Sequence, residues 1–226
     1  MEGCAMNSNE LRSNIKNNKI IVAMRKIYGE HLVKATKLIV KHDIRMVELT
    51  FDQLDDDCME KTSENIKHLK EVFKDQITIG AGTVMNVDQV QIAKEAGAEY
   101  LLAPNTNIDV MNKAHELSLP IIPGAMTPSE IAYAWEHGAA LVKLFPAGSR
   151  GVEYCKSLAS PLNNIPILPM GGVNYKNASD FLKIDNVIGV GVSNALVNKN
   201  LVEKNEWNLI ESNIISFEEV LKMYKD

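Results

Sequence analysis

The chain of 226 residues has few of the features that mark several classes of protein. It contains only three cysteines, Cys4, Cys58 and Cys155, without CxxC spacing, and its five histidines form no HxH or HExxH pair. A disulfide framework and a zinc site are therefore not expected, and the cysteine usage fits a reducing, cytoplasmic compartment. The apolar runs fall far short of the ~20 residues that a membrane span requires, and we expect no export signal.

Neither sign of charge dominates. The 24 Lys and Arg residues against 29 Asp and Glu residues give a net charge of −5, with no concentrated basic stripe. Nucleic acid and anionic membranes are poor partners for such a surface. With 46% hydrophobic and 23% charged residues, the composition is that of an ordinary globular protein.

The sequence does contain a repeated alternation between short apolar runs and longer amphipathic stretches. Each run is too short for a free-standing helix and is bounded by turn residues, which predicts strands buried on both faces. The stretches between them have helical spacing, with helix starts at residues 86–88 and 127–130 and helix ends at Gly97 and Gly138. The eight predicted strands are Ile20–Met24, Met46–Phe51, Ile77–Val84, Tyr100–Pro104, Pro120–Met126, Leu141–Pro146, Pro166–Val173 and Val187–Val192.

Eight strand–helix units without a shift in composition predict an α/β fold with a parallel sheet. Closure into a single-domain (β/α)8 TIM barrel over residues 1–226 fits the strand number and the length better than an open doubly wound sheet. Residues 8–18 are predicted to form an N-terminal helix that caps the bottom of the barrel, and residues 198–226 a closing C-terminal helix.

Three ionisable residues, Arg25, Glu48 and Lys143, lie within or directly after predicted strands, where burial is costly. Because side chains alternate along a strand, Glu48 and Lys143 are expected to point into the barrel near the end where barrel enzymes work. A lysine whose pKa is lowered by burial and by Arg25 would be a free amine able to attack a carbonyl, with Glu48 as acid/base. The alternative is a buried structural ion pair.

Two glycine-containing segments, Gly171–Gly172 and residues 189–193, follow the last two predicted strands. Loops at these positions form the usual phosphate site of barrel enzymes. Each segment alone is more typical of a tight turn, but their joint occurrence favours phosphate binding.

At these residues the chain resembles the KDPG/KHG aldolase family, the class I aldolases that cleave 2-keto-3-deoxy-6-phosphogluconate and 4-hydroxy-2-oxoglutarate. The resemblance covers roughly residues 10–200 in unbroken motif order. The matching motifs are Val47–Thr50, Gly80–Val84, Pro123–Glu130, Lys143–Ala147 and Pro169–Val173.

The resemblance implies a (β/α)8 barrel, a homotrimer, no metal or organic cofactor, and a small keto acid as the partner. It implies that Lys143 forms the Schiff base and that Glu48 is the general acid/base. Pyruvate and glyceraldehyde 3-phosphate, or pyruvate and glyoxylate, would be the products. The substrate-binding residues that it implies are Arg25, Thr83, Pro104, Phe145, Gly171, Gly172, Ser193 and Asn194.

Departures from the family pattern bear on the substrate. Asp52 stands where some members have an arginine that clamps the substrate carboxylate, so Arg25 is expected to take that role. Met170 replaces a threonine near the substrate hydroxyls, and Ser193–Asn194 replaces a Gly-Ser pair. A preference for 2-keto-3-deoxy-6-phosphogalactonate or a related acid therefore stays open. An isomerase or epimerase, and a non-catalytic sugar-acid-phosphate binding barrel, are further alternatives.

The acidic stretch Asp55–Asp57 is expected to be a solvated helix start rather than a lid.

Overall fold

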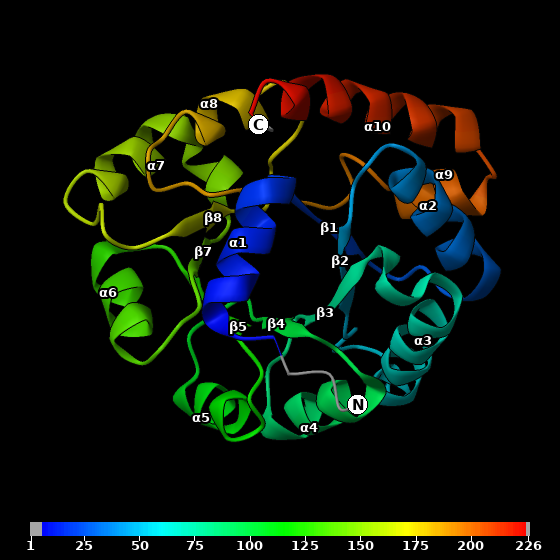
Figure 1. Ribbon diagram of the computed structural model, residues 1–226, viewed down its shortest axis with the longest axis horizontal. Coiled ribbons are helices and arrows are strands. Elements are labelled where there is room, and N and C mark those ends of the chain that lie inside the picture. Colours follow the sequence, from blue (N-terminus) through cyan, green and yellow to red (C-terminus); the bar gives the residue numbers. More distant parts are fainter. Residues whose placement is uncertain (1–5, 225–226) are drawn as a thin grey trace.

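The computed structural model describes residues 6–224 and alternates parallel strands with helices. Helices surround the strands, and α1 crosses in front of them (Figure 1). The strands are β1 (Ile20–Met24), β2 (Met46–Thr50), β3 (Thr78–Gly82), β4 (Tyr100–Leu102), β5 (Ile121–Ile122), β6 (Gly124–Ala125), β7 (Val142–Leu144), β8 (Ile167–Pro169) and β9 (Val190–Val192). The helices are α1 (Ser8–Asn18), α2 (Gly29–Lys41), α3 (Cys58–Phe73), α4 (Val87–Ala96), α5 (Ile108–Glu116), α6 (Pro128–Glu136), α7 (Gly151–Ala159), α8 (Ala178–Leu182), α9 (Lys199–Glu203) and α10 (Trp207–Lys222), with 3-10 turns η1 (Lys74–Gln76) and η2 (Ala147–Ser149).

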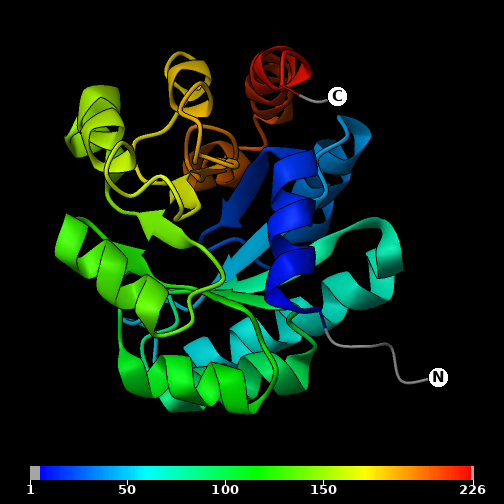
Figure 2. The same ribbon diagram turned by 60° about the vertical axis from the view of Figure 1, so that its left-hand side comes forward.

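The strands form a curled parallel arrangement in two sections (Figure 2). One section has the order β5-β4-β3-β2-β1-β9 and the other the order β6-β7-β8. The prediction of one continuous strand over residues 120–126 is wrong, because this run divides into β5 and β6. Pro123 lies between them and has no N–H to donate to a ladder. Single parallel bridges, Ile167 to Val187 and Met170 to Gly191, join the two sections on the other side.

The helix boundaries follow the local signals in the sequence. Thr127 caps α6 in a reciprocal capping box with Glu130, and Asn86 accepts the backbone N–H of Gln89 at the start of α4. Gly97 ends α4 in the left-handed conformation at φ +93°. The single C-terminal helix predicted over 198–226 is instead two helices, α9 and α10, which residues 204–206 separate.

Side chains alternate between two apolar clusters, and this alternation orients the ionisable residues. On β2, Val47 and Leu49 belong to the large cluster, whereas Met46 belongs to a second, smaller one that also contains Tyr100 and Ile122. On β7, Val142 and Leu144 belong to the large cluster, and Leu141, just before the strand, belongs to the smaller one. Glu48 and Lys143 therefore lie on the same side of the curled sheet as the smaller cluster, as their strand positions predict.

Helix α1 also contributes to the smaller cluster. Leu11 and Ile15 are fully buried there, and Ile15 lies 2.7 Å from the position that a Cβ on Gly189 would take. Because Gly189 and Lys19 directly precede β9 and β1, α1 contacts the N-terminal end of these strands. Within residues 6–224, none of the helices is long and apolar enough to cross a membrane.

Candidate active site

Glu48 lies in the middle of the sheet. It pairs with Ala23 on β1 and with Gly80 on β3, its exposure is 0%, and neither carboxyl oxygen has a hydrogen-bond partner among the described residues. The side chain lies over Gly82, where a Cβ would overlap the carboxyl group. Burial raises the pKa of Glu48 above its usual value, and the positive charges of Lys143 and Arg25 oppose that shift.

Lys143 occupies the corresponding position on β7, between Gly124 on β6 and Leu168 on β8. Its exposure is 3%, and its Nζ lies 4.7 Å from the centre of the Phe145 ring. Burial lowers the pKa of Lys143, Glu48 opposes this shift, and Arg25 adds to it. Burial therefore disfavours the charged form of both groups, which suits groups that exchange protons, while the charge of each partner opposes the shift of the other.

A cavity of about 440 Å³ opens beside Lys143 at the carboxyl ends of the strands. Seven of the predicted site residues line it, and the structure thus brings together most of the predicted site: Arg25, Lys143, Phe145, Gly171, Gly172, Ser193 and Asn194. Glu48, Thr83 and Pro104 are not part of its lining. A Cβ on Gly124, the strand neighbour of Lys143, would overlap the carbonyl of Pro104, so Pro104 lies against β6.

The glycine pair forms one wall of this cavity through its backbone. Gly171 and Gly172 have φ values of +82° and +83°, in the left-handed region that favours glycine. A Cβ on Gly171 would lie 2.9 Å from the Phe145 ring, and a Cβ on Gly172 would lie 2.8 Å from the Cα of Gly148. The pair is therefore a tight turn as well as a cavity wall, and phosphate binding at it stays a prediction.

Thr83 follows β3 and has an unusual backbone conformation. Its φ is +57°, a value that a β-branched residue rarely adopts and that costs of order 1–3 kcal/mol. The carbonyl of Thr83 accepts a hydrogen bond of 2.9 Å from Nε2 of Gln53. Thr83 directly follows Gly82, the residue over which the carboxyl group of Glu48 lies.

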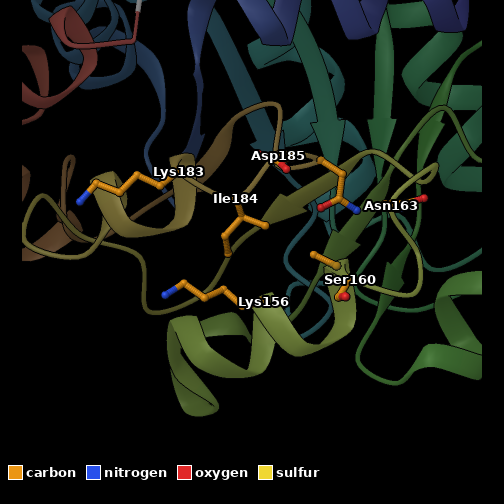
Figure 3. Close-up of a pocket in the computed structure, with 8 residues that line it drawn as sticks. Lys156, Ser160, Asn163, Lys183, Ile184 and Asp185 are labelled. Atoms are coloured by element: carbon orange, nitrogen blue, oxygen red, sulfur yellow. The ribbon is translucent and has the colours of Figure 1, made fainter.

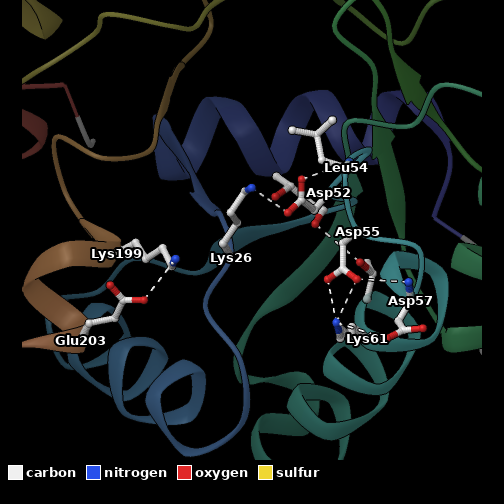
Figure 4. Close-up of polar contacts among 10 residues, drawn as sticks. Lys26, Asp52, Leu54, Asp55, Asp57, Lys61, Lys199 and Glu203 are labelled. Atoms are coloured by element: carbon white, nitrogen blue, oxygen red, sulfur yellow. Dashed lines mark hydrogen bonds and ion pairs between the residues drawn. The ribbon is translucent and has the colours of Figure 1, made fainter.

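Asp52, the residue that stands in place of the family arginine, is paired with Lys26 at 2.7 Å (Figure 4). The hydrogen bond from Lys26 lowers the pKa of Asp52. The negative charge at this position therefore has its own counterion, and Arg25 is the cationic side chain that lines the cavity.

The acidic stretch that follows forms the start of α3. Asp55 and Asp57 lie 2.7 Å and 3.5 Å from Nζ of Lys61, and Asp55 also accepts the backbone N–H of Asp57 (Figure 4). These contacts fit the predicted solvated helix start.

Val173 and Asn174 line the cavity beyond the glycine pair but were not predicted as site residues. The signal for Asn174 was its place directly after the motif Gly171–Val173, in the loop after β8. Met170 also lines the cavity, and its Sδ lies 2.6 Å from the position of a Cβ on Gly191. A thioether therefore stands where the resemblance predicts a hydroxyl.

A separate cavity of about 440 Å³ lies on the outer surface between α7 and the segment after α8 (Figure 3). Its lining includes Lys156, Ser160, Lys183 and Asp185 but none of the predicted site residues. In the described part of the chain, no group of three or more His, Cys, Asp or Glu side chains is arranged to hold a metal ion.

Fold and site together define a parallel α/β protein with a buried amine and a buried carboxyl group beside a cavity. Solved structures share this fold: a KDPG aldolase from Legionella pneumophila has a TM-score of 0.80 at 22% identity, covering 94% of this chain and 98% of that one. A thiamine phosphate pyrophosphorylase from Pyrococcus furiosus has a TM-score of 0.71 at 15% identity, covering 94% and 100%. The fold is therefore common to enzymes with different names, and it does not by itself define the reaction.

Sequence comparison defines the family. The family described as KDPG and KHG aldolase matches residues 11–213. A 2-dehydro-3-deoxy-phosphogluconate aldolase from Haemophilus influenzae is 31% identical over 85% of this chain and 87% of its own length. A KHG/KDPG aldolase from Escherichia coli is 30% identical over 76% and 78%. The chain belongs to the KDPG and KHG aldolase family, whose members, as aldolases, are lyases.

Proposed function

We propose that the chain is a class I aldolase that cleaves 2-keto-3-deoxy-6-phosphogluconate, 4-hydroxy-2-oxoglutarate or both, through a Schiff base on Lys143. The observation that carries this proposal is the pair formed by Lys143, 3% exposed with a lowered pKa, and Glu48, fully buried with a raised pKa. An uncharged amine is the form that attacks a carbonyl, and a carboxyl group with a raised pKa can hold a proton and pass it on during the reaction.

The reaction then follows from these two groups. The amine of Lys143 attacks the C2 ketone, Glu48 gives its proton to the departing hydroxyl group, water leaves, and a protonated imine forms beside the Glu48 carboxylate. The C4 hydroxyl loses its proton to Glu48 or to a water that Glu48 orients, the C3–C4 bond breaks, and its electron pair moves into the imine. Glyceraldehyde 3-phosphate or glyoxylate leaves as the aldehyde. The remaining enamine takes a proton at C3, and water releases pyruvate and the free amine.

The other cavity residues have proposed binding roles. Arg25 and Phe145 line the cavity beside the amine, and Arg25 holds the keto-acid carboxylate. Thr83 and Pro104, which lie outside that lining, are proposed from the family resemblance to complete the carboxylate site and the apolar surroundings of the amine. Gly171, Gly172, Ser193 and Asn194 hold the distal phosphate. The glycine backbone and the small polar side chains on the cavity wall support this last assignment.

Trapping with pyruvate and borohydride tests the proposal. The wild-type chain is expected to lose activity and to carry one reduced pyruvyl group on Lys143, located by peptide mass spectrometry. Lys143→Met is expected to show neither the label nor turnover, whereas Lys156→Met, which changes a surface lysine, retains both. Lys143→Met with turnover intact would refute the mechanism.

Two other functions predict different outcomes. An isomerase or epimerase, in which Lys143 serves only as a charge, would not be labelled. A non-catalytic binding barrel would bind the acids without turning them over. A panel that contains the 6-phosphogluconate- and 6-phosphogalactonate-derived 2-keto-3-deoxy acids identifies the preferred substrate. Met170 is the observation that favours including the second, because its thioether faces the cavity in place of a hydroxyl.

We also infer that residues 1–226 form one domain, a closed (β/α)8 barrel with α1 as a cap on its lower end. The two bridges between β8 and the segment 187–191, and the gap of one residue between β5 and β6, support closure. Burial of Leu11 and Ile15 supports the cap.

The family resemblance further suggests a cytoplasmic homotrimer that acts on sugar acids of the Entner–Doudoroff type. Light scattering after size exclusion should then give about three times the chain mass of 25.1 kDa.

A further inference from the structure

The turn that follows β3 is held at both ends by two glutamine side chains. Gln53, in the loop after β2, donates from Nε2 to the carbonyl of Thr83 at 2.9 Å. Gln89, in the first turn of α4, accepts the backbone N–H of Met85 at 2.7 Å. Three consecutive residues, Thr83 to Met85, therefore lie between two side-chain hydrogen bonds from different elements.

The two glutamines are also joined to each other. Nε2 of Gln89 donates to Oε1 of Gln53 at 3.1 Å. Gln89 is only 2% exposed, and its backbone is held by the cap Asn86. The side chain of Gln89 is therefore held in place by burial and by its hydrogen bonds. Through its bond to Oε1 of Gln53, it orients the exposed amide of Gln53 so that Nε2 faces the Thr83 carbonyl.

The two glutamine hydrogen bonds hold a turn whose first residue, Thr83, has a strained backbone conformation. Thr83 has a φ of +57°, and such conformations persist only where the surroundings over-determine them. Gly82, directly before it, lies under the carboxyl group of Glu48. A change in the turn would consequently move Thr83 relative to Glu48.

We propose that Gln53, anchored by Gln89, is a positioning residue that holds Thr83 in its strained conformation beside Glu48, so that the Thr83 hydroxyl meets the carboxylate of the keto acid. The proposal rests on the function proposed above. Gln53 bonds to the Thr83 carbonyl and Gln89 bonds to Gln53, so in this proposal they act through Thr83 and not by touching the substrate.

Steady-state kinetics on a double-mutant cycle test this role. Gln53→Met removes the donor at an exposed position and is expected to raise KM for the keto acid about 5-fold, the effect typical of one lost hydrogen bond, with kcat changed less than 2-fold. Thr83→Val removes the hydroxyl and keeps the shape of the side chain. In that background Gln53→Met is expected to change KM by less than 2-fold, because the group that it positions is gone.

Two further variants complete the experiment. Gln89→Met is expected to raise KM at least as much as Gln53→Met, because it removes the anchor of Gln53 and the bond to Met85. Gln91→Met is the matched control on α4, since its amide bonds only to Glu95 at the surface, and its KM should equal that of the wild type.

A KM unchanged in Gln53→Met, or an equal increase with and without Thr83→Val, would overturn the proposal. Borohydride trapping separates this result from failure of the proposed function. If pyruvate still labels Lys143 in the wild type while Gln53→Met is neutral, only the positioning role is wrong. If the wild type is not labelled, the aldolase proposal itself fails.

Discussion

Gly82→Ala is expected to displace Glu48 while leaving Lys143 in place. Gly82 is buried at the end of β3, and an added Cβ would overlap the carboxyl group of Glu48. The backbone around it is held by the ladder between β2 and β3, where Thr50 pairs with Gly82. The side chain of Glu48 must therefore move, because the strand cannot.

The stability cost follows from overpacking. Forcing one extra carbon into a closely packed interior typically costs 1–3 kcal/mol, so we expect unfolding to become easier by about 2 kcal/mol. For a chain of this size, that corresponds to a decrease in Tm of about 4–8 °C. The loss of a correctly placed acid/base is expected to lower kcat about 100-fold.

Gly189→Ala is the matched control. Its added Cβ would lie 2.7 Å from the Ile15 side chain at the opposite end of the strands, so a similar loss of Tm is expected with kcat unchanged. Thermal unfolding followed by circular dichroism, and pyruvate release followed with lactate dehydrogenase, measure the two effects. A folded Gly82→Ala protein with the kcat of Gly189→Ala would refute the placement of Glu48 as the acid/base.

Three further predictions concern pH, strain and thiol reactivity. Burial raises the pKa of Glu48, so the folded state holds the Glu48 proton above pH 4.5, where an unfolded glutamate loses it. Glu48 therefore destabilises the folded state increasingly as the pH rises. The gain in the free energy of unfolding caused by Glu48→Gln, measured by urea unfolding, should be larger at pH 7 than at pH 4.5. Thr83→Gly relieves the left-handed φ of a β-branched residue and should raise the free energy of unfolding by about 1 kcal/mol. The same variant should weaken pyruvate trapping. An equal or lower free energy of unfolding would argue against strain at Thr83. Burial raises the pKa of Cys155 to about 12, so iodoacetamide at pH 8 should modify it only after unfolding, as peptide mapping of native and urea-unfolded samples will show.

Much of this architecture could be predicted because a strand buried on both faces has a simple sequence signature. The period of two on β2 and β7 was sufficient to place Glu48 and Lys143 on one side of the sheet. The division of the fifth strand was harder to predict, because it depends on two neighbouring strands that pair with different halves of the run. Pro123 was visible in the sequence, but its effect on the ladder was not.

The arrangement around Thr83 shows the limit of sequence reasoning at the site. Gln53 and Gln89 are polar residues in a loop and a helix, and neither has a spacing that distinguishes it from a solvated side chain. Their contact with each other joins positions 36 residues apart and exists only once β2 and β3 are paired. Tertiary hydrogen bonds of this kind produce no recognisable pattern in the sequence, whereas a lysine within an apolar strand is visible there.

The position of the Phe145 ring limits how substrate preference can be changed by substitutions in the cavity. One side of the ring meets the Lys143 amine, and its edge borders Gly171. A Cβ on Gly171 would lie 2.9 Å from the ring, so enlarging Gly171 would displace the ring and is expected to disturb the surroundings of the amine as well. Asn174 and Ser193 also line the cavity, and we expect substitutions at these two positions to change selectivity with less effect on the amine.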